Sequence, residues 1–443
     1  MFNFSELMLI VVLTIVPAYI VCRKEKRTTR IIFVIISAST FLYSGVGIAY
    51  ETVDSKYIVQ YVLFLVSILV TVKLIFHVRV KRRFNIDTEI GTIDFDCNSK
   101  MVTILTVVFF ISISMHLFYP TFQPWKFFHP SGPISTYIYA QRANSRSYLL
   151  LNICETLSTA CLPFFCMYLK RLVEKHKKLI AVLLVALWAY LTYLQYNYIG
   201  RYQLIVYAAF AYFICAFVRP EGIVVQRKYI IIFASAMIAM IPFLVAYTSI
   251  RKGIISGYSS ISDSISTLIE EECGYPLFYN VCEGLQGTGG RLNFILWMVL
   301  LPIPSAFFIF TSKPTLAVAH QFTYAITGRI FGTGNYSSSL PSVLGEGIMI
   351  WGMNWVWLHG IVMGIFIGIN LRFLKGHRSL DILYLYMITL LAVIGRGGAQ
   401  SYMGTLINGT VFIMLWWWAC NRVRIGSRSL RTELRKNNEA LRI

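Results

Sequence analysis

The stretch YIVQYVLFLVSILVTVKLIF, residues 57–76, contains a single charged side chain, Lys73. An α-helix rises about 1.5 Å per residue, so a run of this length crosses the roughly 30 Å hydrocarbon core of a bilayer. Lipid offers the backbone no hydrogen-bond partner, and a helix satisfies its own polar groups. The stretch therefore predicts a membrane-spanning helix.

Similar apolar runs recur along the chain, which predicts an all-α polytopic membrane protein with about eleven transmembrane helices. We expect residues 1–443 to form a single integral membrane domain. The expected spans are Phe4–Val21, Ile31–Tyr50, Tyr57–Phe76, Met101–Tyr119, Tyr148–Leu169, Leu179–Tyr196, Tyr202–Val218, Tyr229–Thr248, Ser342–Leu371, Asp381–Gly395 and Tyr402–Cys420.

The composition excludes a soluble globular enzyme. The 443 residues are 57% hydrophobic and 14% charged, and a soluble domain of this length needs far more polar surface. The formal net charge of +20 comes from basic residues between the spans, where membrane topology and anionic lipid heads account for it. We therefore expect membrane lipids, and no nucleic acid, as partners.

Clusters of Lys and Arg predict the orientation, because basic residues concentrate in cytoplasmic connections. With eleven spans, all six clusters fall on one face, so the N-terminus is expected outside and the C-terminus inside. The first apolar segment lacks the features of a cleavable signal peptide and is expected to remain as a span. Residues 421–443 form the expected basic cytoplasmic tail. The clusters are Arg23–Arg30, Arg79–Arg83, Lys170–Lys178, Arg219–Lys228, Arg372–Arg378 and Arg422–Arg442.

Residues 249–341 interrupt the series of spans and form one large expected loop outside the membrane. Phe294–Phe310 within it is long enough to span, but counting it as a span would reverse every connection downstream. It also contains Pro302 and Pro304, which interrupt a regular helix. We expect a re-entrant or interfacial segment here.

Five arginines lie in or beside outer connections, where cationic residues are normally scarce. Guanidinium groups bind phosphate with parallel charge-assisted hydrogen bonds, so the set predicts an anion site. The alternative is that these side chains reach toward lipid headgroups. The candidates are Arg201, Arg251, Arg291, Arg329 and Arg396.

Glu346 stands at the outer start of an expected span, where a carboxylate is costly unless it faces the bundle interior. Partial burial would raise its pKa toward the range useful for a general base; the alternative is a structural ion pair with an arginine. His320 is the second candidate base, although a solvated loop histidine is the competing interpretation. For His359, inside a span, we expect a packing role. The sequence has no histidine and cysteine cluster with zinc spacing, so we expect neither metal nor cofactor.

Cys273 and Cys282 both fall in the large loop with eight residues between them. In an oxidising compartment they could form a disulfide; the alternative is two unpaired thiols.

The segment from Leu301 to Gly360 resembles the C-terminal half of bacterial O-antigen and oligosaccharide repeat-unit polymerases of the Wzy type. The motifs are Leu301-Pro-Ile-Pro304, Lys313-Pro314 and Pro341-Ser-Val-Leu-Gly-Glu346-Gly, followed by Trp351-Gly352 and Gly360. The Gly200-Arg201 turn also fits, but Tyr202 follows where that family usually has a small residue. The resemblance implies a membrane-embedded, metal-independent glycosyltransferase of the C type (GT-C) in the bacterial inner membrane.

Such an enzyme would polymerise undecaprenyl-pyrophosphate-linked glycans at the periplasmic face, with these glycans as both donor and acceptor. A chain-length regulator protein could be a partner. The resemblance leaves open an O-antigen ligase with the same fold. A flippase or transporter is the alternative from another class, and it predicts ionisable residues deep within spans.

Overall fold

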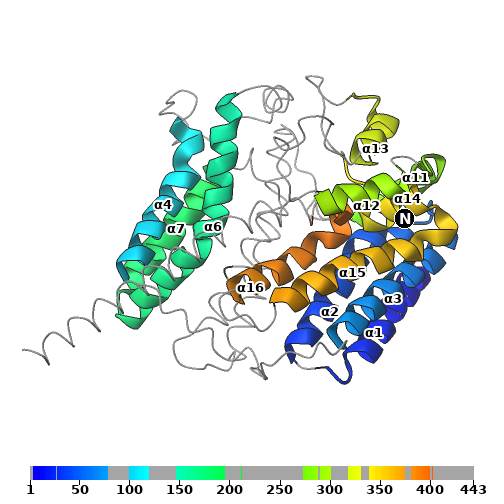
Figure 1. The fold of residues 1–443 in the computed structure, drawn as a ribbon, viewed down its shortest axis with the longest axis horizontal. Coiled ribbons are helices and arrows are strands. Elements are labelled where there is room, and N and C mark those ends of the chain that lie inside the picture. Colours follow the sequence, from blue (N-terminus) through cyan, green and yellow to red (C-terminus); the bar gives the residue numbers. More distant parts are fainter. Residues whose placement is uncertain are drawn as a thin grey trace, which may run out of the picture.

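The computed structural model describes residues 3–25, 27–77, 99–118, 146–194, 211, 273–287, 290–300, 318–330, 339–374, 381–399 and 402. The described residues form an all-helical structure with twelve α-helices and short 3-10 and π-helical segments (Figure 1). The α-helices are α1 (Phe4–Cys22), α2 (Arg27–Thr40), α3 (Lys56–His77), α4 (Ser99–Phe118), α6 (Arg146–Glu174), α7 (Lys178–Leu194), α11 (Tyr279–Gly284), α12 (Arg291–Leu300), α13 (Val318–Thr327), α14 (Ser342–Trp351), α15 (Val356–Leu374) and α16 (Asp381–Leu390).

Four described helical segments are long and apolar enough to cross a membrane, which is the pattern of a multi-pass membrane protein. They are Phe4–Cys22, Thr29–Ala49, Lys56–His77 and Met353–Leu374. The first three match expected spans within two residues at each end. Helices α4, α6, α7 and α16 lie where further spans are expected. The expected spans Tyr202–Val218 and Tyr229–Thr248 lie outside the described residues except for Ala211, as does Tyr402–Cys420 except for Tyr402.

The expected single span Ser342–Leu371 is wrong, because the structure divides it into α14 and α15. The break is at Gly352, whose φ of 86° and ψ of 164° suit only glycine. A 3-10 turn, η6 (Met353–Trp355), then leads into α15. The ten residues of α14 are all buried, and this helix is too short to cross a bilayer.

Helices α3 and α15 pack side by side along their length (Figure 1). Gly360, Gly364 and Gly368 recur every four residues and place one glycine stripe of α15 against α3. A Cβ at Gly364 would lie 2.8 Å from Thr71 Cβ and 3.1 Å from the Ile68 carbonyl oxygen. Small residues at this spacing are typical of helix pairs in membranes, because they let two backbones approach closely.

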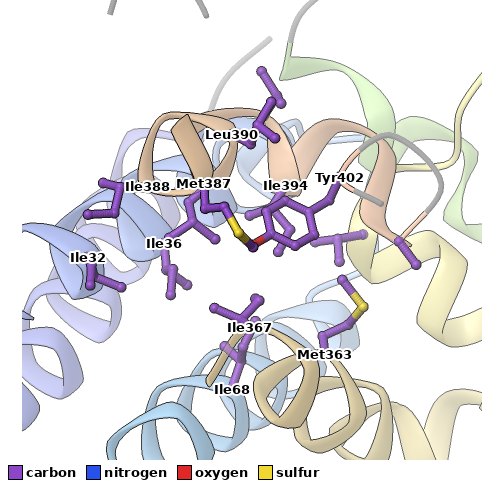
Figure 2. Packing of buried hydrophobic residues seen from close by; sticks show 14 of the residues in the cluster. Ile32, Ile36, Ile68, Met363, Ile367, Met387, Ile388, Leu390, Ile394 and Tyr402 are labelled. Carbon is purple, nitrogen blue, oxygen red and sulfur yellow. The ribbon is translucent and has the colours of Figure 1, made fainter. Parts of the chain in front are cut away.

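Apolar side chains from α2, α3, α15 and α16 meet in one region of the core, shown in Figure 2. Tyr402 projects into this region beside Met387 and Ile394 (Figure 2). Other labelled members are Ile32, Ile36, Ile68, Met363, Ile367, Ile388 and Leu390. Burial of these side chains packs α16 against α15, and the 3-10 turn that follows it, η8 (Leu391–Val393), against α2.

Helices α4, α6 and α7 form a second group, drawn apart from the first in Figure 1. Their shared contact is aromatic: the rings of Phe109 and Phe165 stack at 5.0 Å, and Trp188 meets Phe165 edge-on at 5.7 Å.

The four long helical segments have one basic end. Here Lys73 lies 3.7 Å from Glu25, and Arg372 donates a hydrogen bond of 2.6 Å to the Ile75 carbonyl. The opposite end carries the Lys56–Glu283 ion pair, with a separation of 2.9 Å. The positive-inside expectation assigns the basic end to the cytoplasm.

The described parts of the large loop lie at the end opposite the basic one. Helix α12 covers the first part of the expected re-entrant segment Phe294–Phe310, and its ten residues are too few to span. Residues 301–317 lie outside the described part.

Candidate functional site

The candidate site is built around α14, the short buried helix that follows the large loop. Ser342 begins the helix with a φ of 63°, a strained value for a non-glycine residue. Its hydroxyl accepts a hydrogen bond of 3.3 Å from the Gly345 N–H, as an N-cap does. The Tyr279 hydroxyl lies 3.0 Å away, and the Ser44 hydroxyl donates at 3.3 Å. These contacts hold the start of α14 in one position.

Ser44 belongs to a π-helical segment, η1 (Phe41–Gly45), which interrupts the second spanning helix. Such interruptions are rare in helices and frequently mark functional sites. This one brings Ser44 and Tyr43 to the region where α14 begins.

Glu346 lies in the middle of α14 and is 2% exposed. Its Oε1 accepts one hydrogen bond of 3.3 Å from the Ala399 N–H. Its Oε2 faces the α-carbon of Gly398, where a Cβ would overlap the carboxyl; the φ of Gly398 is 55°. Burial, offset only in part by the Ala399 bond, raises the pKa of Glu346 from an ordinary 4.5 to about 8. The carboxyl therefore exchanges its proton at a pH close to neutral.

His359 on α15 faces the same carboxyl. Its Nε2 lies 3.7 Å from Glu346 Oε1 and has no hydrogen-bond partner among the described residues. Its Nδ1 accepts a hydrogen bond of 3.3 Å from the Trp351 indole N–H. Because Nδ1 accepts, the ring proton of neutral His359 is assigned to Nε2, which faces Glu346. Trp351 and His359 are thus joined by a hydrogen bond, and Glu346 lies beside His359 without a hydrogen bond to it.

The expected packing role of His359 is confirmed, because the ring is fully buried and packs against two phenyl rings. The Phe64 ring stacks at 6.0 Å and the Phe294 ring lies at 5.4 Å. The approach of His359 to Glu346 was not predicted from the sequence. Gly347 makes it possible, since a Cβ there would lie 2.9 Å from Val356 Cγ2 and 3.1 Å from His359 Cβ. The sequence signal was the pair of glycines that flanks Glu346.

Arg291 extends the chain of contacts to the surface. It begins α12, and its Nη2 donates a hydrogen bond of 3.3 Å to the Trp351 carbonyl at the end of α14. Its guanidinium lies over the Trp351 ring, 5.9 Å from the centroid. Arg291 is itself exposed. A cation at the surface is therefore bonded to Trp351, whose indole is bonded to the His359 ring that lies beside the buried carboxyl.

Arg396 approaches the site from the other side. It lies in the helical segment 394–399, three residues before the Ala399 N–H that binds Glu346. Its Nε donates a hydrogen bond of 2.9 Å to the Tyr275 hydroxyl, and the Tyr275 ring meets Tyr43 edge-on at 6.0 Å. Arg396 is half-buried.

Two other candidates lie on α13 or directly after it, and α13 contacts α11 and α14. His320 is half-buried, and burial lowers its pKa. Arg329 is exposed beyond the end of α13, where its backbone N–H donates to the Thr327 hydroxyl at 3.3 Å. No contact between either residue and Glu346 is seen within the described ranges. Arg201 and Arg251 lie outside those ranges.

The disulfide expected between Cys273 and Cys282 is not formed: both thiols are buried and no S–S bond joins them. Cys282 instead packs under α14, where a Cβ at Gly345 would lie 3.2 Å from its Sγ. Its thiol fills space between α11 and α14, as a small apolar side chain would.

The part of the chain that the structure describes contains no group of three or more His, Cys, Asp and Glu side chains arranged to hold a metal ion. Comparison of the chain with models of protein families, with curated proteins and with solved structures found no match.

Proposed function

We propose that this protein is an inverting glycosyltransferase that polymerises undecaprenyl-pyrophosphate-linked repeat units into a surface polysaccharide at the periplasmic face of a bacterial inner membrane. Two lines support the proposal: the resemblance in Leu301–Gly360, and the position of Glu346. A lone buried carboxylate inside a membrane bundle is costly and usually functional. This one lies between two arginine-bearing segments.

In the proposed reaction, an acceptor sugar hydroxyl attacks the anomeric carbon of the donor sugar. The bond from that carbon to the pyrophosphate oxygen breaks, and its electron pair leaves with the pyrophosphate. Glu346 takes the hydroxyl proton, a contribution of roughly 10²–10⁴-fold for a positioned base. A base whose pKa is near the working pH suits this task.

The leaving pyrophosphate needs compensating charge rather than a proton. Arg291 and Arg396 are the described candidates, with Arg201, Arg251 and Arg329 as further members of the proposed set. Arg396 would act closest to the carboxyl, because its helical segment also binds Glu346. His320 remains the second proposed base.

Substrate access requires movement, since Glu346 is almost fully covered. The covering segment Gly395-Arg396-Gly397-Gly398 is rich in glycine, which lets a backbone change conformation at little steric cost. We propose that this segment opens when the lipid-linked acceptor binds.

A deletion strain and two point variants test the proposal in cells. The deletion should leave lipid capped with one repeat unit, since synthesis and ligation of single units continue. Arg396→Ala and Arg291→Ala should give the same pattern, while Lys178→Ala, which removes an exposed cation at the start of α7, should retain normal chain length. Loss of all glycan in the deletion would indicate the ligase instead, and normal polymer in both arginine variants would contradict their role.

One observation favours a second candidate, a proton-coupled transporter. Glu346 and His359 are both buried within the bundle and lie 3.7 Å apart, an arrangement that could carry a proton. A transporter would move a solute in response to a pH gradient and would make no polymer from purified lipid-linked units.

A further inference from the structure

A groove lies between α1 and α2, away from Glu346. Its volume is about 440 Å³, within the range of about 300–1,000 Å³ typical of ligand sites. One face of α1 forms one wall of the groove. One face of α2, together with Phe41 directly after it, forms the other wall. The lining residues are Val11, Thr14, Ile15, Ala18, Tyr19, Cys22, Val34, Ser37, Ala38 and Phe41.

The groove is suited to hydrocarbon. Helix α1 is exposed along most of its length, with Val12, Val16 and Ile20 among its uncovered side chains. Ala18 and Ala38 leave room where larger residues would close the space. Because both helices span the membrane, the groove faces lipid. A lipid acyl chain is therefore the flexible apolar group available to fill it.

One polar atom in the groove lacks a partner. Ser37 is 4% exposed, and its hydroxyl has no hydrogen bond within the described part of the chain. It lies eight residues along the helix from Thr29, about 12 Å below the basic end at the helical rise. A double bond in the middle of an unsaturated chain would offer this hydroxyl a weak π acceptor at that depth.

The groove runs toward the basic end, where Cys22 is its last lining residue on α1. Arg23 and Lys24 follow directly and are exposed. Arg30 is also exposed, and its backbone carbonyl lies 4.0 Å from Cys22 Sγ. The nearby carboxylate of Glu25 is buried and neutralised by Lys73 at 3.7 Å. Two exposed cations therefore follow the last groove residue of α1 along the chain, and Arg30, whose Nε donates a hydrogen bond of 2.6 Å to the Glu25 carbonyl, lies beside that residue.

We propose that this groove binds one unsaturated acyl chain of an anionic phospholipid, with the phosphate held by Arg23, Lys24 and Arg30. Basic pockets between spanning helices recognise anionic headgroups in this way. The lipid would fasten α1 to α2 at the basic end. This site is independent of the proposed transferase reaction.

The test uses the full chain in nanodiscs containing phosphatidylglycerol with a photoreactive group in one unsaturated acyl chain. Adducts mapped by mass spectrometry should concentrate between Val11 and Cys22 and between Val34 and Phe41. Phosphatidylcholine with the same chains should label these segments at least tenfold less. Equal labelling by both lipids, or adducts spread evenly over all lipid-facing helices, would overturn the proposal.

Two variants separate the headgroup from the chain. Arg23→Gln with Lys24→Gln should weaken phosphatidylglycerol binding about 25-fold, because each basic side chain near an anionic surface contributes about fivefold. Ala18→Phe should fill the groove and abolish the adducts. The matched controls are Lys177→Gln with Lys178→Gln, and Leu187→Phe on α7, which should change neither result.

If Ala18→Phe fails to fold, the variant Arg23→Gln with Lys24→Gln and the wild-type adduct map still test the proposal. Stronger protection of the groove by a polyprenyl phosphate than by phosphatidylglycerol would overturn the assignment to a membrane phospholipid.

Discussion

At the scale of single residues, the inward-facing position of Glu346 could be predicted from the sequence, because a carboxylate in an apolar run is costly unless it faces the bundle interior. Its partners could not be predicted. The ion pair with an arginine, one sequence interpretation, is absent for Arg291, Arg329 and Arg396, and Glu346 instead meets a backbone N–H and His359. These contacts join segments far apart in the chain, and no local pattern encodes them.

Replacement of Glu346 by Gln should stabilise the protein by an amount that depends on pH. The pKa of Glu346 is raised from 4.5 to about 8 on folding. Ionisation of this carboxyl therefore does not destabilise the folded state below pH 4.5, and its destabilising effect grows between pH 4.5 and about pH 8. Thermal unfolding in detergent should show similar midpoints for Glu346→Gln and wild type at pH 4.5. Above that pH the variant should become progressively more stable than wild type. A difference that does not change with pH would contradict the burial of an ionisable group here.

At the scale of helices, hydrophobicity and length predicted most elements well, including three of the four long spanning segments within two residues. Hydrophobicity and length did not predict that Ser342–Leu371 divides into two helices, because the sequence stays apolar across the break between α14 and α15. The backbone conformation at Gly352, not a change in polarity, ends α14 there. The sequence carried that signal only as a glycine between Trp351 and Met353.

The glycine stripe on α15 gives a prediction for helix packing. Gly364→Ala gains up to about 1 kcal/mol of helix propensity, but its Cβ would lie 2.8 Å from Thr71 Cβ and 3.1 Å from a backbone oxygen. Neither atom can yield without moving α3, so the thermal midpoint should fall. Gly284→Ala is the control, because nothing lies within 4 Å of its added Cβ. A gain in stability for Gly364→Ala would show that α3 and α15 do not pack this closely.

At the scale of the whole molecule, the charge pattern predicted which end of the bundle is basic, and the described helices place Arg23, Lys24, Lys73 and Arg372 at one end. The number of spans and the environment of Arg201 and Arg251 fall outside the described residues. They stay predictions.

Labelling of single cysteines tests the orientation. In a chain without other reactive thiols, Asp54→Cys should react with an impermeant reagent added to the periplasm of intact cells. Lys24→Cys should react only after the inner membrane is made permeable. The reverse pattern would place the Glu346 end in the cytoplasm, where lipid-linked repeat units are not polymerised in the proposed reaction.

The most direct test of Glu346 as the base is the rate of polymer formation by the purified chain in proteoliposomes with lipid-linked repeat units, measured from pH 6 to pH 9. With a base of pKa about 8, the wild-type rate should rise about tenfold per pH unit below pH 8 and then level off, and Glu346→Gln should form no polymer. Polymer from Glu346→Gln at the wild-type rate, or a wild-type rate that does not change with pH, would contradict the assignment.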